Sequence, residues 1–258
     1  MAVFRAFKAL RPTEGKAAAV AALPYDVVNR EEAAAIGKEN PDSFLHVDRA
    51  EMDLPAETDL YDAKVYQKAK ENLHKMEETG VLVQDNKPCY YIYELVRKGK
   101  VQTGIAGCAS IDDYLNNVVK KHELTRSDKE LDRINHVDVC DANTGPIYLA
   151  CRYTDALSAL LEQWKKEHKA TYDFTEEDEI THRVWVIDGD EAISQIQGEM
   201  EKIPALYIAD GHHRAASAVK VGLKRRQENP DYTGEEAFNY FLSVVFSYDQ
   251  LTILAYNR

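Results

Sequence analysis

The sequence contains few of the residues that cross-link small secreted proteins. It has 4 cysteines among 258 residues, and no two of them form a C-x-x-C pair. The cysteines are Cys89, Cys108, Cys140 and Cys151. Such irregular spacing fits neither a disulfide framework nor a structural zinc site. We therefore expect reduced thiols in a chain that is long enough to bury a core without covalent support.

Long hydrophobic runs are also missing. No apolar run approaches the roughly 20 residues that a membrane-spanning helix requires. The N-terminal segment 1–7 lacks the extended apolar core of a signal peptide. Both absences predict a cytoplasmic protein that has no membrane partner.

Positive charge is in deficit. The chain has 32 Lys and Arg against 44 Asp and Glu, which gives a net charge of −12. This balance argues against nucleic acid as the main partner, although a local basic pocket is compatible with it. Hydrophobic residues make up 45% and charged residues 29%, as in an ordinary soluble globular protein.

Hydrophobic periodicity predicts a mixture of hairpins and strand–helix units. Helices are expected over 31–38, 58–79, 128–139, 155–168 and 191–201, and from the segment 210–214 to about 226. Strands are expected over 89–93, 101–111, 183–187, 205–209, 240–246 and 250–256. This order predicts an α+β fold, a mixed sheet with flanking helices, in a single domain over 1–258.

The C-terminal segment 251–256 is too apolar to be left in water without cost. We expect it to be a strand whose outer edge is completed either by a further C-terminal region or by a second copy of the chain. On this interpretation the sequence is part of a longer protein, or the protein is a homo-oligomer.

The segment Asp210-Gly211-His212-His213-Arg214 carries the strongest functional signal. It joins the predicted strand 205–209 to an amphipathic helix, which places Asp210 at the helix N-cap. Backbone N–H groups and the helix dipole at such a junction suit an anion, and the histidines add groups that titrate near neutral pH. The alternative is an ordinary Asp-Gly turn with solvated histidines, and spacing alone leaves both interpretations open.

A second cluster precedes and enters the predicted helix 128–139. His122 and Glu123 fall in the loop before it, and Arg126 lies just ahead of its N-terminus. Lys129 and Arg133 are one turn apart on one face, so three cations are placed to bind a phosphate group. The alternative is a solvated helix face on which acidic neighbours pair with these cations. A metalloprotease H-E-x-x-H motif is excluded, because Arg126 stands where the second histidine is needed.

Over its whole length the chain resembles a bacterial and archaeal family known as the domain of unknown function number ten-fifteen. Five separated segments carry the resemblance, and they occur in the family's order. The segments are Phe7–Pro12, Pro24–Val28, Asn40–Val47, His122–Thr125 and Ala209–Arg214. Members of this family are usually longer, and the resemblance supplies no function.

The 210–214 segment is also similar to the signature of free serine kinases in the ParB/sulfiredoxin-like superfamily, where a strand–turn–helix holds nucleotide phosphate. The resemblance implies a nucleotide site at this turn, with Asp210 near the magnesium ion or the phosphate. It places Gly211, His212, His213 and Arg214 around the transferring phosphoryl group. Those kinases also carry a His-Glu pair upstream, and His122–Glu123 is its counterpart here. The resemblance makes Glu123 the base for a substrate hydroxyl.

Phosphoryl transfer requires cations on the phosphates, a carboxylate that holds the metal and a base that orients the acceptor. The sequence offers all three, without a Walker A motif or a kinase glycine-rich loop. We therefore expect a phosphotransferase that uses ATP or ADP with Mg²⁺ and acts on a small hydroxyl-bearing metabolite. A non-catalytic nucleotide-binding switch is the second hypothesis, and a structural or partner-binding protein is the third. In the first two, the 210–214 turn and the 122–126 loop share one cleft.

Overall fold

The structure is a computed structural model that describes residues 1–123, 127–176 and 179–252. Its helices are α1 (Ala17–Val20), α2 (Arg30–Glu39), α3 (Leu45–Asp48), α4 (Ala63–Glu78), α5 (Ile111–Leu115), α6 (Ser127–Cys140), α7 (Asp155–Glu167), α8 (Asp190–Glu201) and α9 (His212–Glu228), with 3-10 turns η1 (Ala50–Asp53) and η2 (Ala237–Asn239). Its strands are β1 (Phe4–Arg5), β2 (Leu10–Pro12), β3 (Leu82–Gln84), β4 (Tyr90–Arg97), β5 (Lys100–Ser110), β6 (Val119–Lys120), β7 (Ile147–Cys151), β8 (Tyr172–Thr175), β9 (Thr181–Ile187), β10 (Leu206–Asp210) and β11 (Tyr240–Ser247).

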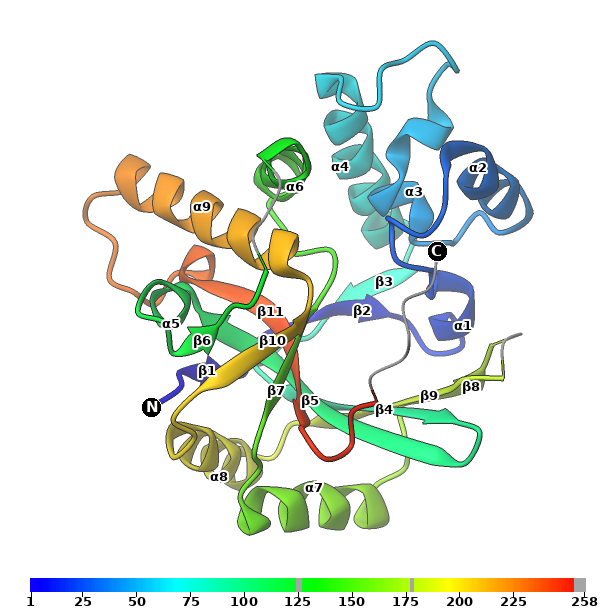
Figure 1. The fold of residues 1–258 in the computed structure, drawn as a ribbon. Coiled ribbons are helices and arrows are strands. Elements are labelled where there is room, and N and C mark those ends of the chain that lie inside the picture. The colour runs from blue at the N-terminus through cyan, green and yellow to red at the C-terminus, as the bar shows by residue number, and fades with distance from the viewer. Residues whose placement is uncertain (124–126, 177–178, 253–258) are drawn as a thin grey trace.

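One large mixed sheet organises the chain. Its strand order is β6-β10-β7-β11-β5-β4-β9-β8, and the short β1 pairs with β5 off this path. The β10–β6 and β11–β7 pairs are parallel, and the other pairs are antiparallel. Helices α7 and α8 lie on one side of the sheet, and α6 and α9 lie on the other (Figure 1). The predicted α+β fold with a mixed sheet and flanking helices is confirmed.

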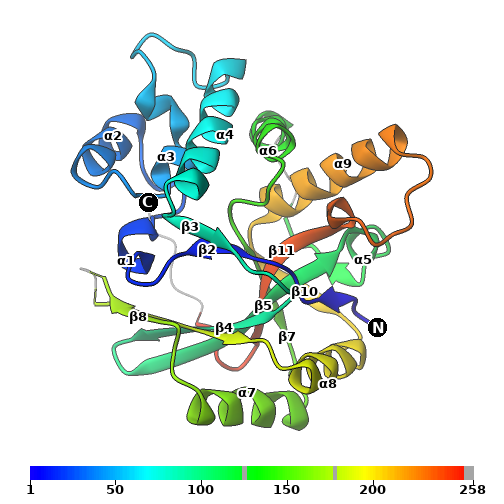
Figure 2. The same ribbon diagram turned by 180° about the vertical axis from the view of Figure 1, so that it is seen from behind.

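The two largest buried cores among the described residues support this arrangement. The larger one is built on the sheet, and the smaller one lies among the N-terminal helices α3 and α4 with strand β3, beside the small β2–β3 sheet (Figure 2). Helix α6 connects the two cores. Cys140 at its end belongs to the smaller core. Near its start, the Glu130 carbonyl accepts a hydrogen bond from Ser217 of α9, a helix that contributes to the larger core. The prediction of one domain over 1–258 stays a prediction. Among the described helices, none combines the length and the apolar character needed to cross a membrane.

Helix boundaries follow local capping. Helix α2 begins after Asn29, which forms a capping box with Glu32, as expected for the predicted helix 31–38. The helix predicted over 58–79 begins only at Ala63, because Asp62 accepts a hydrogen bond from the Lys64 N–H and caps the helix there.

The strand predicted over 250–256 is not formed where the structure describes it. Residues 250–252 are in a turn and irregular backbone, and 253–256 lie outside the described residues. The side-chain oxygen of Gln250 accepts a hydrogen bond from the Thr103 N–H instead of joining a ladder. Strand β11, which precedes this segment, is paired on both edges, with β5 and β7.

Two helical glycines give a matched stability prediction. A Cβ added at Gly222 of α9 would overlap the backbone oxygen of Phe238 and lie 2.7 Å from Ile111 Cδ1, whereas a Cβ at Gly198 of α8 would meet nothing within 4 Å. We expect Gly222→Ala to lower the free energy of unfolding by about 1–3 kcal/mol through overpacking. Gly198→Ala should raise it by up to about 1 kcal/mol through helix propensity. Urea denaturation measures both, and equal effects would contradict the close packing of α9 on η2.

Candidate functional site

The turn between β10 and α9 is built differently from the predicted N-cap. Asp210 is the last residue of β10 and lies opposite Tyr148 of β7, so it is held in the sheet. Gly211 is the N-cap, with φ +92°, a backbone conformation that glycine adopts without strain. Gly211 has no side chain with which to cap α9, and the Asp210 carboxylate accepts instead from the Arg214 guanidinium at 2.5 Å. The prediction that Asp210 caps the helix is wrong.

Arg214 joins this turn to a neighbouring loop. Its Nη1 donates to the Pro146 carbonyl at 2.5 Å, and its Nη2 donates to Asp210. The guanidinium packs close enough to Gly211 that an added Cβ there would lie 3.2 Å from Arg214 Nε. Arg214 is therefore a half-buried structural residue as well as a cation in the N-terminal turn of α9.

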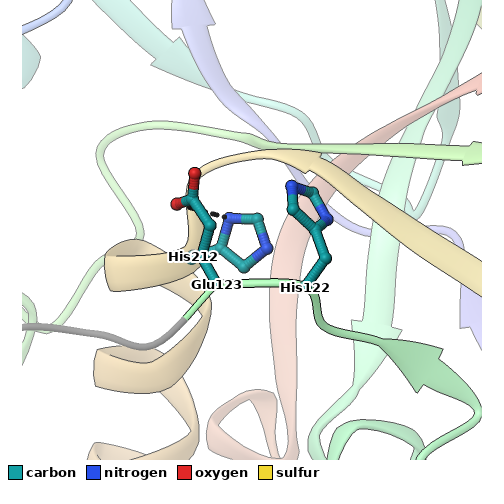
Figure 3. Close-up of side chains that lie close together, drawn as sticks. All are labelled: His122, Glu123 and His212. Carbon is teal, nitrogen blue, oxygen red and sulfur yellow. Dashed lines mark ion pairs between the residues drawn. The ribbon is translucent and has the colours of Figure 1, made fainter.

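The His122–Glu123 loop contacts the first turn of α9. His212 Nδ1 lies 3.4 Å from Glu123 Oε2, and the His122 and His212 rings meet edge to face with centroids 4.4 Å apart (Figure 3). The predicted proximity of the two motifs, which are far apart in the sequence, is confirmed. Among the residues that the structure describes, these three are the group of His, Cys, Asp and Glu side chains whose ligand atoms all lie within 4.8 Å of one another.

Burial sets the protonation of His212. The ring is 6% exposed, and this burial lowers its pKa, with a further contribution from neighbouring His122 that outweighs the opposing effect of Glu123. Burial therefore favours the neutral form of His212, which is able to accept a proton. His212 Nε2 and His213 Nδ1 are both buried and have no hydrogen-bond partner among the described residues.

The basic residues of α6 are not a uniform solvated face. Lys129 is exposed, but Arg133 is only 8% exposed. The Arg133 guanidinium lies over the Tyr25 ring at 4.1 Å and pairs with Asp132 at 2.7 Å. Both cations line one small cavity of about 200 Å³, in agreement with their predicted common face. Arg126, the third predicted cation, lies outside the described residues.

A larger cavity of about 590 Å³ opens beside the α9 turn, within the range of small-molecule sites. Its polar lining includes Tyr25, Asp48, Arg133, His136, Asp210 and Arg214. Its apolar lining includes Leu10, Val20, Leu23, Phe44 and Leu82. The predicted common cleft is therefore formed only in part, because His122, Glu123, His212 and His213 do not line this cavity.

Comparison with models of protein families identifies the family of this chain. The model of the family described as "Protein of unknown function (DUF1015)" matches residues 4–258. The chain belongs to this family. Comparison with curated proteins and with solved structures gave no match.

The five segments that carry the DUF1015 resemblance lie around the large cavity and the first turn of α9. Four of them supply cavity-lining residues, namely Leu10, Tyr25, Phe44 and the pair Asp210 and Arg214. The fifth supplies His122 and Glu123, which contact His212 in the same helix turn as Arg214. Segments that are dispersed in the sequence thus surround a single cavity and the head of α9.

Sequence reasoning assigned no role to three polar residues that the cavity brings together. His136 is 2% exposed, its Nε2 lies 3.0 Å from the Val47 carbonyl, and burial lowers its pKa. Asp48 accepts a hydrogen bond from the Thr144 hydroxyl at 2.7 Å. Tyr25 belongs to the Pro24–Val28 segment of the family resemblance, and this membership is the sequence signal that could have identified it as a site residue. Asp48 lies one residue beyond such a segment, and His136 carries no local signal.

Proposed function

We propose that this DUF1015 chain is a nucleotide-dependent phosphotransferase that acts on a small hydroxyl-bearing metabolite of the cytoplasm. The observation that carries the proposal is the convergence of four of the five family segments on a cavity with two arginines, Arg133 and Arg214, in its wall. Each guanidinium group already pairs with an aspartate, Arg133 with Asp132 and Arg214 with Asp210. Planar guanidinium groups have several N–H donors and bind phosphate in bidentate geometry, so both can also contact an anionic ligand. The N–H groups of the first turn of α9, which an α-helix leaves without an intrahelical partner, add to this preference.

In the proposal, residues of the β10–α9 turn and of the adjoining His122–Glu123 loop meet the requirements of phosphoryl transfer. In the proposal the nucleotide phosphates lie at the 211–214 turn, with Arg214 beside them and the rest of the ligand in the cavity. Asp210, which pairs with Arg214, would hold Mg²⁺ together with the phosphates, since this ion needs only one or two carboxylates from the protein. The ion would neutralise charge on the phosphates. Glu123 accepts the proton of the acceptor hydroxyl, with neutral His212 and exposed His122 beside it.

A second function is favoured by one specific feature of the geometry. The proposed base, Glu123, does not line the cavity that contains the arginines. A protein that binds a nucleotide there and changes its partners without chemistry requires no base in the cavity. The non-catalytic switch is therefore the alternative to the phosphotransferase.

The test is a ³¹P NMR assay of the purified chain with ATP or ADP, Mg²⁺ and pools of small hydroxyl-bearing metabolites. A phosphotransferase converts the donor and produces a new phosphomonoester resonance that depends on one pool. Nucleotide resonances that broaden or shift without turnover would favour the switch. Unchanged spectra with every pool and both nucleotides would contradict both functions.

A further inference from the structure

The cluster at the start of α9 has the composition of a metal centre. It contains two imidazoles and one carboxylate, from His122, His212 and Glu123, and their ligand atoms lie within 4.8 Å of one another. We propose that these three side chains bind a divalent transition metal ion such as Zn²⁺. This site is separate from the Mg²⁺ position at Asp210, and it does not depend on the proposed phosphotransfer.

The closest spacing in the cluster fits shared coordination better than a direct ion pair. Nitrogen and oxygen ligands at about 2.0–2.2 Å from a tetrahedral Zn²⁺ are separated from each other by about 3.3–3.6 Å. His212 Nδ1 and Glu123 Oε2 are 3.4 Å apart, whereas a charge-assisted hydrogen bond has a length of about 2.7–2.9 Å. The longer separations in the cluster close by rotation of His122 and Glu123, whose side chains are both exposed.

A second observation points to a ligand. His212 is 6% exposed, and its Nε2 is buried without a hydrogen-bond partner among the described residues. Figure 3 shows this second ring nitrogen on the side of His122, while Nδ1 faces Glu123. Buried polar atoms normally have a partner, so an unsatisfied imidazole nitrogen within this group calls for one. A metal ion takes one nitrogen of an imidazole ring: at Nε2 it supplies this missing partner, and at Nδ1 it is shared with Glu123.

The donor set selects the class of metal. Imidazole nitrogen suits zinc and other later transition ions, whereas Mg²⁺ and Ca²⁺ take oxygen ligands almost exclusively. Three protein ligands leave at least one coordination position open, which is the pattern of catalytic rather than structural zinc. Glu123 has two carboxylate oxygens, so metal on one of them leaves the other able to accept a proton.

The site is tested by titrating the metal-free full chain with Zn²⁺ against a chromophoric chelator, and with Co²⁺ followed by visible absorption. We expect one Zn²⁺ per chain and a Co²⁺ spectrum typical of low coordination number. His122→Ala and Glu123→Gln should each weaken Zn²⁺ binding about 100-fold or more, since even the loss of a supporting residue outside the ligand set costs 10–100-fold. Both side chains are exposed, so these variants are expected to fold even if His212→Ala does not.

His74→Ala is the matched control, because His74 is also exposed and lies beside a glutamate, Glu77, on α4. It should leave the Zn²⁺ affinity unchanged. Zn²⁺ binding that is absent, or that is equal in wild type and both cluster variants, would overturn the proposal. Since no nucleotide is added, failure here leaves the phosphotransferase proposal intact. If the chain binds Zn²⁺ but a separate titration shows no nucleotide binding, that result would count against the phosphotransferase proposal alone.

Discussion

Replacing Glu123 with glutamine should abolish phosphoryl transfer and leave nucleotide affinity within about twofold of wild type. The amide keeps the shape of the carboxylate but cannot accept the proton of the acceptor hydroxyl. General base catalysis contributes about 10²–10⁴-fold to the rate, and we expect a loss of kcat in that range. Steady-state kinetics gives kcat, and calorimetric titration with Mg²⁺-nucleotide gives the affinity.

The control for this change is Glu191→Gln, because Glu191 is exposed on α8, on the side of the sheet opposite α9. It should have wild-type kinetics. A Glu123→Gln enzyme that keeps more than about a tenth of the wild-type kcat would remove Glu123 from the role of base. Parallel loss of turnover and nucleotide affinity would instead show that the residue acts in binding.

Replacing Arg214 with glutamine should weaken the binding of nucleotide by about 10- to 100-fold. A hydrogen bond to a charged group contributes about 1.5–3 kcal/mol, which corresponds to that range of affinity. The substitution also removes the hydrogen bonds to Pro146 and Asp210, so some loss of stability is expected in addition. Calorimetry below the unfolding transition separates the two effects.

Arg225→Gln is the matched control for Arg214→Gln. Arg225 lies in the same helix, but it pairs with Asp138 at 3.1 Å and Asp141 at 3.0 Å, and it does not line the large cavity. Its replacement should lower stability without changing the affinity for nucleotide. If the two variants bind nucleotide equally well, Arg214 contacts no phosphate and serves only to connect α9 to the 143–146 loop.

The sequence predicts the local structure of the site well, because local rules decide it. The strand–turn–helix around Gly211 follows from hydrophobic periodicity and from the conformational freedom of glycine. The capping preference predicts Asp210 as the N-cap of α9, which is wrong because pairing with β7 holds this residue in the sheet and its carboxylate pairs with Arg214. Long-range contacts thus override the N-cap preference of Asp210. The same kind of preference holds for Asn29, which does cap α2.

The cavity could not be predicted in the same way. Its wall combines the N-terminal segments near Tyr25 and Asp48 with His136 of α6, and no periodicity relates these residues. Their positions depend on how the smaller core packs against α6, which is a property of the tertiary structure. The sequence predicts that the two motifs lie close together, because each alone supplies an incomplete set of groups for handling phosphate, but it does not predict the contact between Glu123 and His212.

The central claim is that nucleotide phosphates bind at the first turn of α9. Hydrogen exchange followed by mass spectrometry, with and without saturating ADP or ATP and Mg²⁺, tests it most directly. The account predicts slower exchange confined to peptides that cover 20–25, 143–146 and 210–215, and no such protection in the Arg214→Gln variant at the same nucleotide concentration. Unchanged exchange with both nucleotides, or protection in other parts of the chain alone, would contradict it.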